Sequence, residues 1–137
     1  MLLRLIILIT FCVIMYVIYR VVIRWQLSRA GKLKEVDPII SDINLMFPTL
    51  VYFTTPMCAI CRTTQRPAFD RLKAKMDQIN IVKVDAAEDR ESAQRWGVLS
   101  VPTTFVLDKD GNPVKVNNGF VDEHKLSSQL LAAHGLA

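Results

Sequence analysis

The sequence predicts an α/β fold, a small mixed β-sheet flanked by helices, preceded by one amino-terminal transmembrane helix. Three observations support this prediction. An uncharged apolar run from Leu5 to Tyr19 opens the chain. Short β-rich runs then alternate with segments of helical periodicity. The pair Asp110-Gly111 finally separates two β-rich runs as a hairpin turn would. The 137 residues leave room for one domain besides the apolar segment.

The apolar run is short for a membrane span. Its fifteen residues rise roughly 22 Å as a helix, against a hydrocarbon core of about 30 Å. Apolar residues on both sides lengthen it, and the flanking Arg4 and Arg20 can reach the lipid headgroups. No small-residue cleavage pattern follows the run. We therefore expect residues 1–25 to be an uncleaved anchor, with a cleaved signal peptide or an interfacial helix as the alternatives.

Positive charge is concentrated near the amino terminus. Residues 1–35 hold six of the seventeen basic residues and one of the thirteen acidic residues. Residues 26–37 are therefore expected to form a basic stalk, and residues 38–137 to form the folded domain. Residues 36–137 carry eleven bases and twelve acids, a net charge of −1. Nucleic acid is not an expected partner, because binding it needs a basic face on the domain.

Periodicity places the elements of the domain. Strands are expected at residues 50–53, 79–84, 103–107 and 114–116. Helices are expected at residues 59–77 and 88–96, with a last helix that carries Leu126, Leu130 and Ala133 on one face and ends at Gly135. The resulting order is β-α-β-α-β-β-α. Its β-α-β unit implies a parallel pair with a right-handed crossover, and the hairpin adds an antiparallel strand.

The motif Cys58-Ala59-Ile60-Cys61 falls where a strand passes through a loop into a helix. Cys58 is therefore expected at the helix start, where unpaired backbone N–H groups and the helix dipole stabilise a thiolate. Cys61 would lie one turn further, close enough for a disulfide. The third cysteine, Cys12, lies inside the apolar run and is expected to be a small apolar side chain there.

Metal-binding proteins share the C-x-x-C motif, but the residues around it here differ from theirs. Haem attachment requires a histidine after the second cysteine, where this chain has Arg62. A structural zinc site needs two further ligands, and the two histidines, His124 and His134, lie far along the chain. A copper carrier would have methionine two residues before the first cysteine, whereas Met57 is adjacent to Cys58. No metal is expected, and a copper carrier stays an alternative.

A second stretch makes the pattern specific. The segment WGVLSVPTTFVLDKDGNPV, residues 96–114, closely resembles the part of the thioredoxin family that surrounds its cis-proline. The resemblance covers roughly residues 47–135 and includes the strand before the cysteines, the C-x-x-C motif and the hairpin. It implies a thioredoxin-like fold with Cys58 as the attacking thiol and Cys61 as the resolving thiol. Pro102 would be cis and pack against the disulfide, and the backbone of Val101 would pair with an extended substrate segment.

Three departures from the family pattern accompany the resemblance. The usual W-C-G-P-C motif is replaced, which leaves a more apolar lip at Met57, a third expected substrate contact. The buried acid of the family, a proton acceptor for the second cysteine, aligns with Tyr52, and its lysine partner is expected to align with Ile81. The proline of the helix is one residue later than usual, at Pro67, and is expected to kink the helix.

The resemblance therefore implies a protein-disulfide oxidoreductase that needs no cofactor, because the cysteine pair holds the two electrons. Its partners would be protein thiols or disulfides, an upstream thiol reductant or oxidant, and the lipid bilayer. A non-catalytic adaptor that binds a partner in the cis-proline groove is the main alternative. Five basic residues follow the span, against Arg4 and the α-amino group before it. This bias favours a cytoplasmic domain on a single-pass membrane protein, with an extracytoplasmic domain as the alternative.

Overall fold

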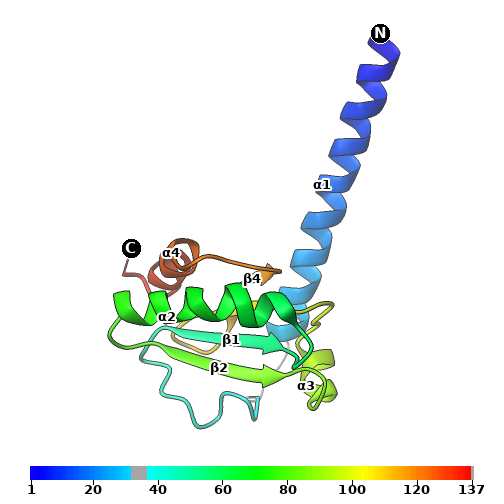
Figure 1. The fold of residues 1–137 in the computed structure, drawn as a ribbon. Coiled ribbons are helices and arrows are strands. Elements are labelled where there is room, and N and C mark those ends of the chain that lie inside the picture. The colour runs from blue at the N-terminus through cyan, green and yellow to red at the C-terminus, as the bar shows by residue number, and fades with distance from the viewer. Residues whose placement is uncertain (32–36, 137) are drawn as a thin grey trace.

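The computed structural model describes residues 1–31 and 37–136. After the long helix α1 (Leu2–Gly31), the elements follow the predicted order. They are β1 (Thr49–Thr54), the π-helical segment η1 (Cys61–Gln65), α2 (Arg66–Lys75), β2 (Asn80–Asp85), α3 (Arg90–Arg95), β3 (Thr103–Leu107), β4 (Pro113–Asn118) and α4 (Glu123–Ala133). Figure 1 shows α1 leaving the domain as a single helix whose amino-terminal part stands free.

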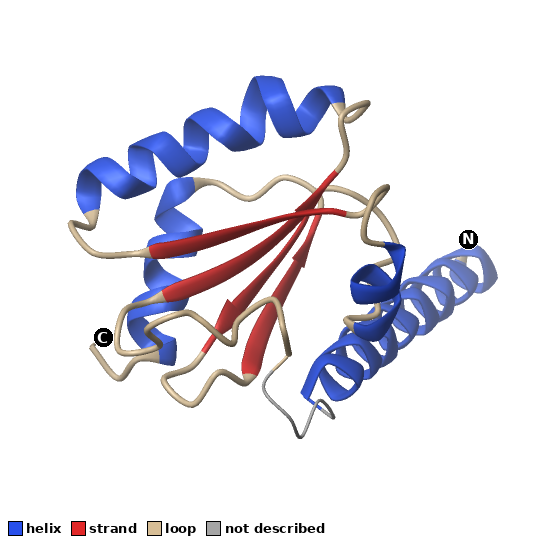
Figure 2. Cartoon of the chain, turned by 90° about the horizontal axis from the view of Figure 1, so that it is seen from below, coloured by secondary structure: helices blue, strands red, loops and turns tan. Residues whose placement is uncertain are grey.

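The four strands form one mixed sheet in the order β2-β1-β3-β4. β1 pairs with β2 in parallel and with β3 antiparallel, and β3 pairs antiparallel with β4. All six residues of the central strand β1 are buried, and its side chains alternate between two cores. Leu50 and Tyr52 pack with α2 and α4, whereas Val51 and Phe53 pack with α1 and Trp96. Helices thus cover both faces of the sheet (Figure 2).

The helix after the cysteines differs from the continuous helix predicted at 59–77. It begins at Ala59 as predicted, but its residues 61–65 form η1, in which the N–H of Arg66 donates to the carbonyl of Cys61, five residues earlier. This wider turn accommodates one more residue before Pro67, which has no N–H to donate. The helix ends at Lys75, because Met76 is already extended. The next helix also begins later than predicted, because the Asp89 side chain caps it by accepting the Ser92 N–H at 2.9 Å.

The first six residues of the expected stalk at 26–37 form the last turns of α1. Two of them, Gln26 and Ala30, are buried against the domain. Gln26 Nε2 donates to the Gly97 carbonyl and to Asn118 Oδ1, both at 3.1 Å, and Asn118 Nδ2 donates back to Gln26 Oε1 at 2.8 Å. These polar contacts and the buried Ala30 fix α1 to the domain. Residues 32–36 of the expected stalk lie outside the described residues.

Replacing Gln26 with leucine tests this attachment. The leucine keeps the side-chain volume but leaves the Gly97 carbonyl and the Asn118 amide without their partner. We expect a loss of about 1–3 kcal/mol in unfolding free energy, measured by chemical unfolding of the full chain in detergent. Ser28→Ala, an exposed change on the same helix, is the control and should leave the midpoint unchanged. Equal midpoints for both variants would contradict the attachment.

Candidate active site

Cys58 lies between the end of β1 and the first helical residues after it. Its N–H donates to the Thr55 carbonyl at 3.2 Å, which closes the turn that follows the strand. The N–H of Cys61 points back at Cys58 Sγ, 3.2 Å away. The sulfur of Cys58 therefore sits in the partly positive environment at a helix start, which favours the thiolate form.

The two cysteines predicted as the reactive pair are joined by a disulfide, with their Cα atoms 5.3 Å apart. Their environments differ. Cys61 is only 2% exposed and belongs to the core between the sheet and the helices α2 and α4. Cys58 is half-buried and only borders that core. The pair therefore presents one accessible sulfur and one covered sulfur.

The loop before β3 lies beside this pair. The Val101-Pro102 peptide bond is cis, as predicted, and Pro102 is buried. Val101 packs against the same core as both cysteines. Among the described residues, no group hydrogen-bonds the backbone N–H or carbonyl of Val101. The structure thus brings Val101 to the cysteine pair, whereas the side chain of Met57 points to solvent and is 89% exposed.

Two contacts that hold this arrangement were not predicted from the sequence. Gln65 is fully buried in η1, where its Nε2 donates to the Val121 carbonyl at 2.9 Å and its Oε1 accepts the Val121 N–H at 3.0 Å. The N–H of Gly119 donates to the Pro102 carbonyl at 2.7 Å. The φ of Gly119, +87°, is a conformation that favours glycine. A lone glutamine in a polar helix segment gives no sequence signal for such a role.

The expected partner of Tyr52 is corrected by the strand register. Ile81 lies opposite Leu50, and Lys83 lies opposite Tyr52 on the parallel neighbour β2. The register is set at the start of β2, where the Asn80 N–H donates to the Pro48 carbonyl at 2.8 Å. A basic side chain is therefore present beside the position where the family has its buried acid.

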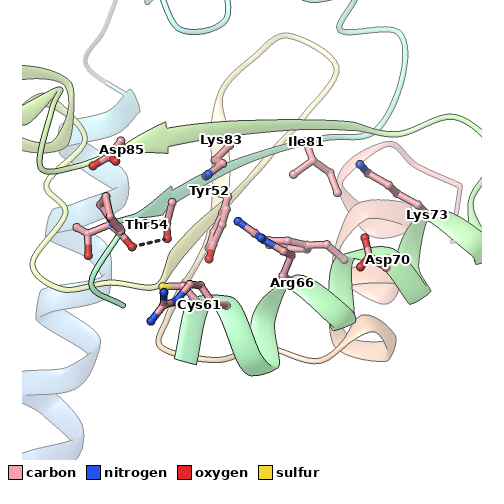
Figure 3. Close-up of a pocket in the computed structure, with 13 residues that line it drawn as sticks. Tyr52, Thr54, Cys61, Arg66, Asp70, Lys73, Ile81, Lys83 and Asp85 are labelled. Carbon is pink, nitrogen blue, oxygen red and sulfur yellow. Dashed lines mark hydrogen bonds between the residues drawn. The ribbon is translucent and has the colours of Figure 1, made fainter. Parts of the chain in front are cut away.

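A cavity of about 460 Å³ opens behind the cysteine pair, between β1, β2 and the helix. Tyr52, Arg66 and Lys83 converge on it, and Cys61 lies at one end (Figure 3). The Tyr52 hydroxyl is buried and has no hydrogen-bond partner within the described residues. Burial raises the pKa of this phenol above its ordinary value, although the nearby Thr54 hydroxyl and Arg66 guanidinium act in the opposite direction. The phenol is therefore a neutral donor at physiological pH.

A strand-loop-helix unit with a disulfide at the helix start and a cis-proline loop beside it defines the class of thiol-disulfide oxidoreductases. The thioredoxin family model matches residues 35–132, and the chain belongs to the thioredoxin family. It is 38% identical to thioredoxin of Bacillus subtilis over 78 residues, 56% of this chain and 73% of that protein. It is also 35% identical to protein disulfide-isomerase erp38 of Neurospora crassa over 77 residues, 53% of this chain but 21% of that protein.

Solved structures agree with this assignment. A mutant thioredoxin from Halobacterium salinarum superposes with a TM-score of 0.59 and 27% identity, covering 72% of this chain and 82% of that one. The structure of thioredoxin-2, a component of malaria parasite protein secretion machinery, superposes with a TM-score of 0.54 and 26% identity, covering 64% of this chain and 84% of that one. Of the alternatives left by the sequence, the protein-disulfide oxidoreductase is the one that these relatives support.

Replacing Tyr52 with phenylalanine removes a hydroxyl that has no partner among the described residues, and it keeps the ring, which packs edge-on against Phe69 with 4.7 Å between ring centroids. A buried hydroxyl without a partner costs about 1–3 kcal/mol, so we expect Tyr52→Phe to be at least as stable as the native protein. Tyr52→Leu is the control, because it also loses the ring contact and should be destabilised. Thermal unfolding of the oxidised full chain measures both. A clear loss of stability in Tyr52→Phe would mean that the hydroxyl is bonded in the protein.

Proposed function

We propose that Cys58 attacks the substrate and that Cys61 resolves the mixed disulfide, in a protein held at a membrane by α1. The contrast between the two sulfurs carries the assignment of roles. Cys58 Sγ is accessible and accepts the N–H of Cys61 at 3.2 Å, whereas Cys61 is 2% exposed. The thiolate is the nucleophile in disulfide exchange, so the accessible and stabilised sulfur attacks first.

The proposed reaction proceeds in two exchanges. The Cys58 thiolate attacks one sulfur of a protein disulfide, and the other sulfur leaves as a thiolate. Cys61 then attacks Cys58 Sγ, forms the intramolecular disulfide and releases the second substrate thiolate. The two electrons come from the cysteine pair, so the reaction needs no further cofactor. An upstream thiol reductant returns the pair to the dithiol, and an oxidant would drive the same steps in reverse.

We assign substrate binding to the rim formed by Val101, Pro102 and Met57. The support is that the Val101 backbone has no partner among the described residues and lies beside the cysteine pair. An extended substrate segment can add to such a backbone as a short strand. Met57 is 89% exposed and adjacent to the attacking cysteine, where it offers an adaptable apolar contact.

Serine variants test the two roles. Cys61→Ser removes the second attack, so substrates should accumulate as mixed disulfides on Cys58. Cys58→Ser should trap none, and it serves as the matched control. The adducts are measured by non-reducing electrophoresis and mass spectrometry. Faster alkylation of Cys61 than of Cys58 in the reduced protein at neutral pH would overturn the assignment.

The membrane proposal depends on α1. The helix is long and apolar enough to cross a membrane, with a mean hydropathy of 2.6 in its best 18-residue window, and none of that window is buried in the domain. A signal sequence would share these properties, but the last turns of α1 are packed into the domain. Five basic residues follow the apolar run, against Arg4 and the α-amino group before it. This bias supports a domain on the cytoplasmic side, where the thiol pool is reducing.

Reporter fusions after Ala137 test this topology. We expect a carboxy-terminal fluorescent protein to be fluorescent and a carboxy-terminal alkaline phosphatase to be inactive, because the phosphatase folds only outside the cytoplasm. As a control, Arg20→Gln combined with Arg24→Gln reduces the charge bias and should raise phosphatase activity. High phosphatase activity in the native chain would make this an extracytoplasmic oxidoreductase.

A further inference from the structure

We propose that the cavity behind the disulfide binds a small carboxylate or oxyanion, held by Tyr52, Arg66 and Lys83 beside Cys61. The inference rests on the proposed resolving role of Cys61. The cavity has about 460 Å³, which is ample for an anion between formate and phosphate in size. The cavity opens to solvent between β2 and α2, and Cys61 lines its inner end (Figure 3).

The charges around the cavity favour an anion. Four basic side chains and two carboxylates line it: Arg62, Arg66, Lys73 and Lys83, with Asp70 and Asp85. Within the described residues, none of the four bases forms an ion pair. The Asp85 carboxylate accepts the Ala87 N–H at 2.8 Å in the turn after β2. With four bases against two carboxylates, the lining carries a formal excess of two positive charges.

The Tyr52 hydroxyl is the second, independent observation. Tyr52 is 5% exposed, its oxygen is buried and has no hydrogen-bond partner among the described residues, and the side chain points from β1 toward the helix that carries Cys61 and Arg66 (Figure 3). A buried hydroxyl normally has a hydrogen-bond partner. A bound carboxylate or phosphate oxygen would accept this O–H and the charged N–H groups of Arg66 and Lys83 together. Such charge-assisted bonds are about twice as strong as neutral ones.

The position of the cavity next to Cys61 gives the bound anion a role. When Cys61 attacks the mixed disulfide, its S–H proton passes to the anion and its sulfur bonds to Cys58 Sγ. The bond between Cys58 and the substrate sulfur breaks, and the substrate leaves as a thiolate. The anion thus becomes the conjugate acid and returns its proton to solvent. In this way a bound ligand supplies the proton acceptor that the phenol at Tyr52 does not provide.

Binding is tested on the oxidised full chain in neutral detergent, at constant ionic strength. Formate and phosphate are titrated separately, and the amide resonances of Arg66 and Lys83 are followed by NMR. We expect saturable shifts, with half-saturation raised at least tenfold in the double variant Arg66→Gln/Lys83→Gln and several-fold in Tyr52→Phe. The matched control Arg90→Gln/Lys109→Gln removes the same charges from exposed positions outside the cavity and should bind as the native chain does.

Kinetics test the proton transfer and the source of the anion. Resolution of a preformed Cys58 mixed disulfide should become several-fold faster at saturating formate. Tyr52→Asp supplies a carboxylate from the chain, so its resolution should not respond to formate. If the anion comes from the substrate, a peptide disulfide with a neighbouring glutamate should resolve faster than its glutamine counterpart without added formate.

The outcomes separate this inference from the proposed function. Absence of saturable shifts with both anions, together with equal rates for the two peptides, would overturn the site. Binding that leaves the resolution rate unchanged would overturn the proton transfer. Insulin reduction with dithiothreitol, measured in the same preparation, reports the oxidoreductase activity separately. A chain that reduces insulin but binds no anion would refute only this inference, whereas a chain that binds the anion without reducing insulin would refute the function.

Discussion

The burial of β1 is the constraint on which the rest of the structure depends. All six residues of this strand are buried, and the strand is paired on both edges. A strand covered on both faces must end where the chain can reach the surface, and here it ends four residues before Cys58. The following helix packs back on the same sheet through Phe69 and Leu72. Its first turn, with the cysteine pair, is therefore held at the edge of the core, with one sulfur covered and the other accessible.

Local patterns were sufficient to predict the order of the elements and the position of the cysteine pair. The apolar run at residues 50–53 and the hairpin turn at Asp110-Gly111 depend on neighbouring residues only, and both match the structure. The cis bond before Pro102 was predicted from the resemblance to the family. That resemblance depends on the spacing between motifs that lie far apart in the sequence. Features that depend on the exact register or on single buried polar side chains were not predicted.

The errors have identifiable physical reasons. The pairing of Tyr52 with Lys83 depends on the bond between the Asn80 N–H and the Pro48 carbonyl, and a two-residue shift moves a different side chain to the same face. The attachment of α1 depends on Gln26, whose partners are 71 and 92 residues away along the chain. A polar residue in a basic segment predicts a solvated stalk unless such partners are known. The π-helical segment likewise depends on tertiary packing, because Cys61 before Pro67 and Phe69 after it must both reach the same core.

The attachment of α1 links this helix to the loop beside the cysteine pair through few hydrogen bonds. Gln26 is bonded to Asn118, and Asn118 Oδ1 also accepts the Thr103 hydroxyl at 3.2 Å. Thr103 follows Pro102, the residue whose cis bond shapes the loop beside the disulfide. Helix α1 is continuous up to Gly31, and its last turns are bonded to the domain through Gln26. The domain therefore cannot turn freely about the helix. If α1 spans a bilayer, the direction in which Cys58 faces is then set relative to the membrane, and only substrates that approach from that side reach Cys58.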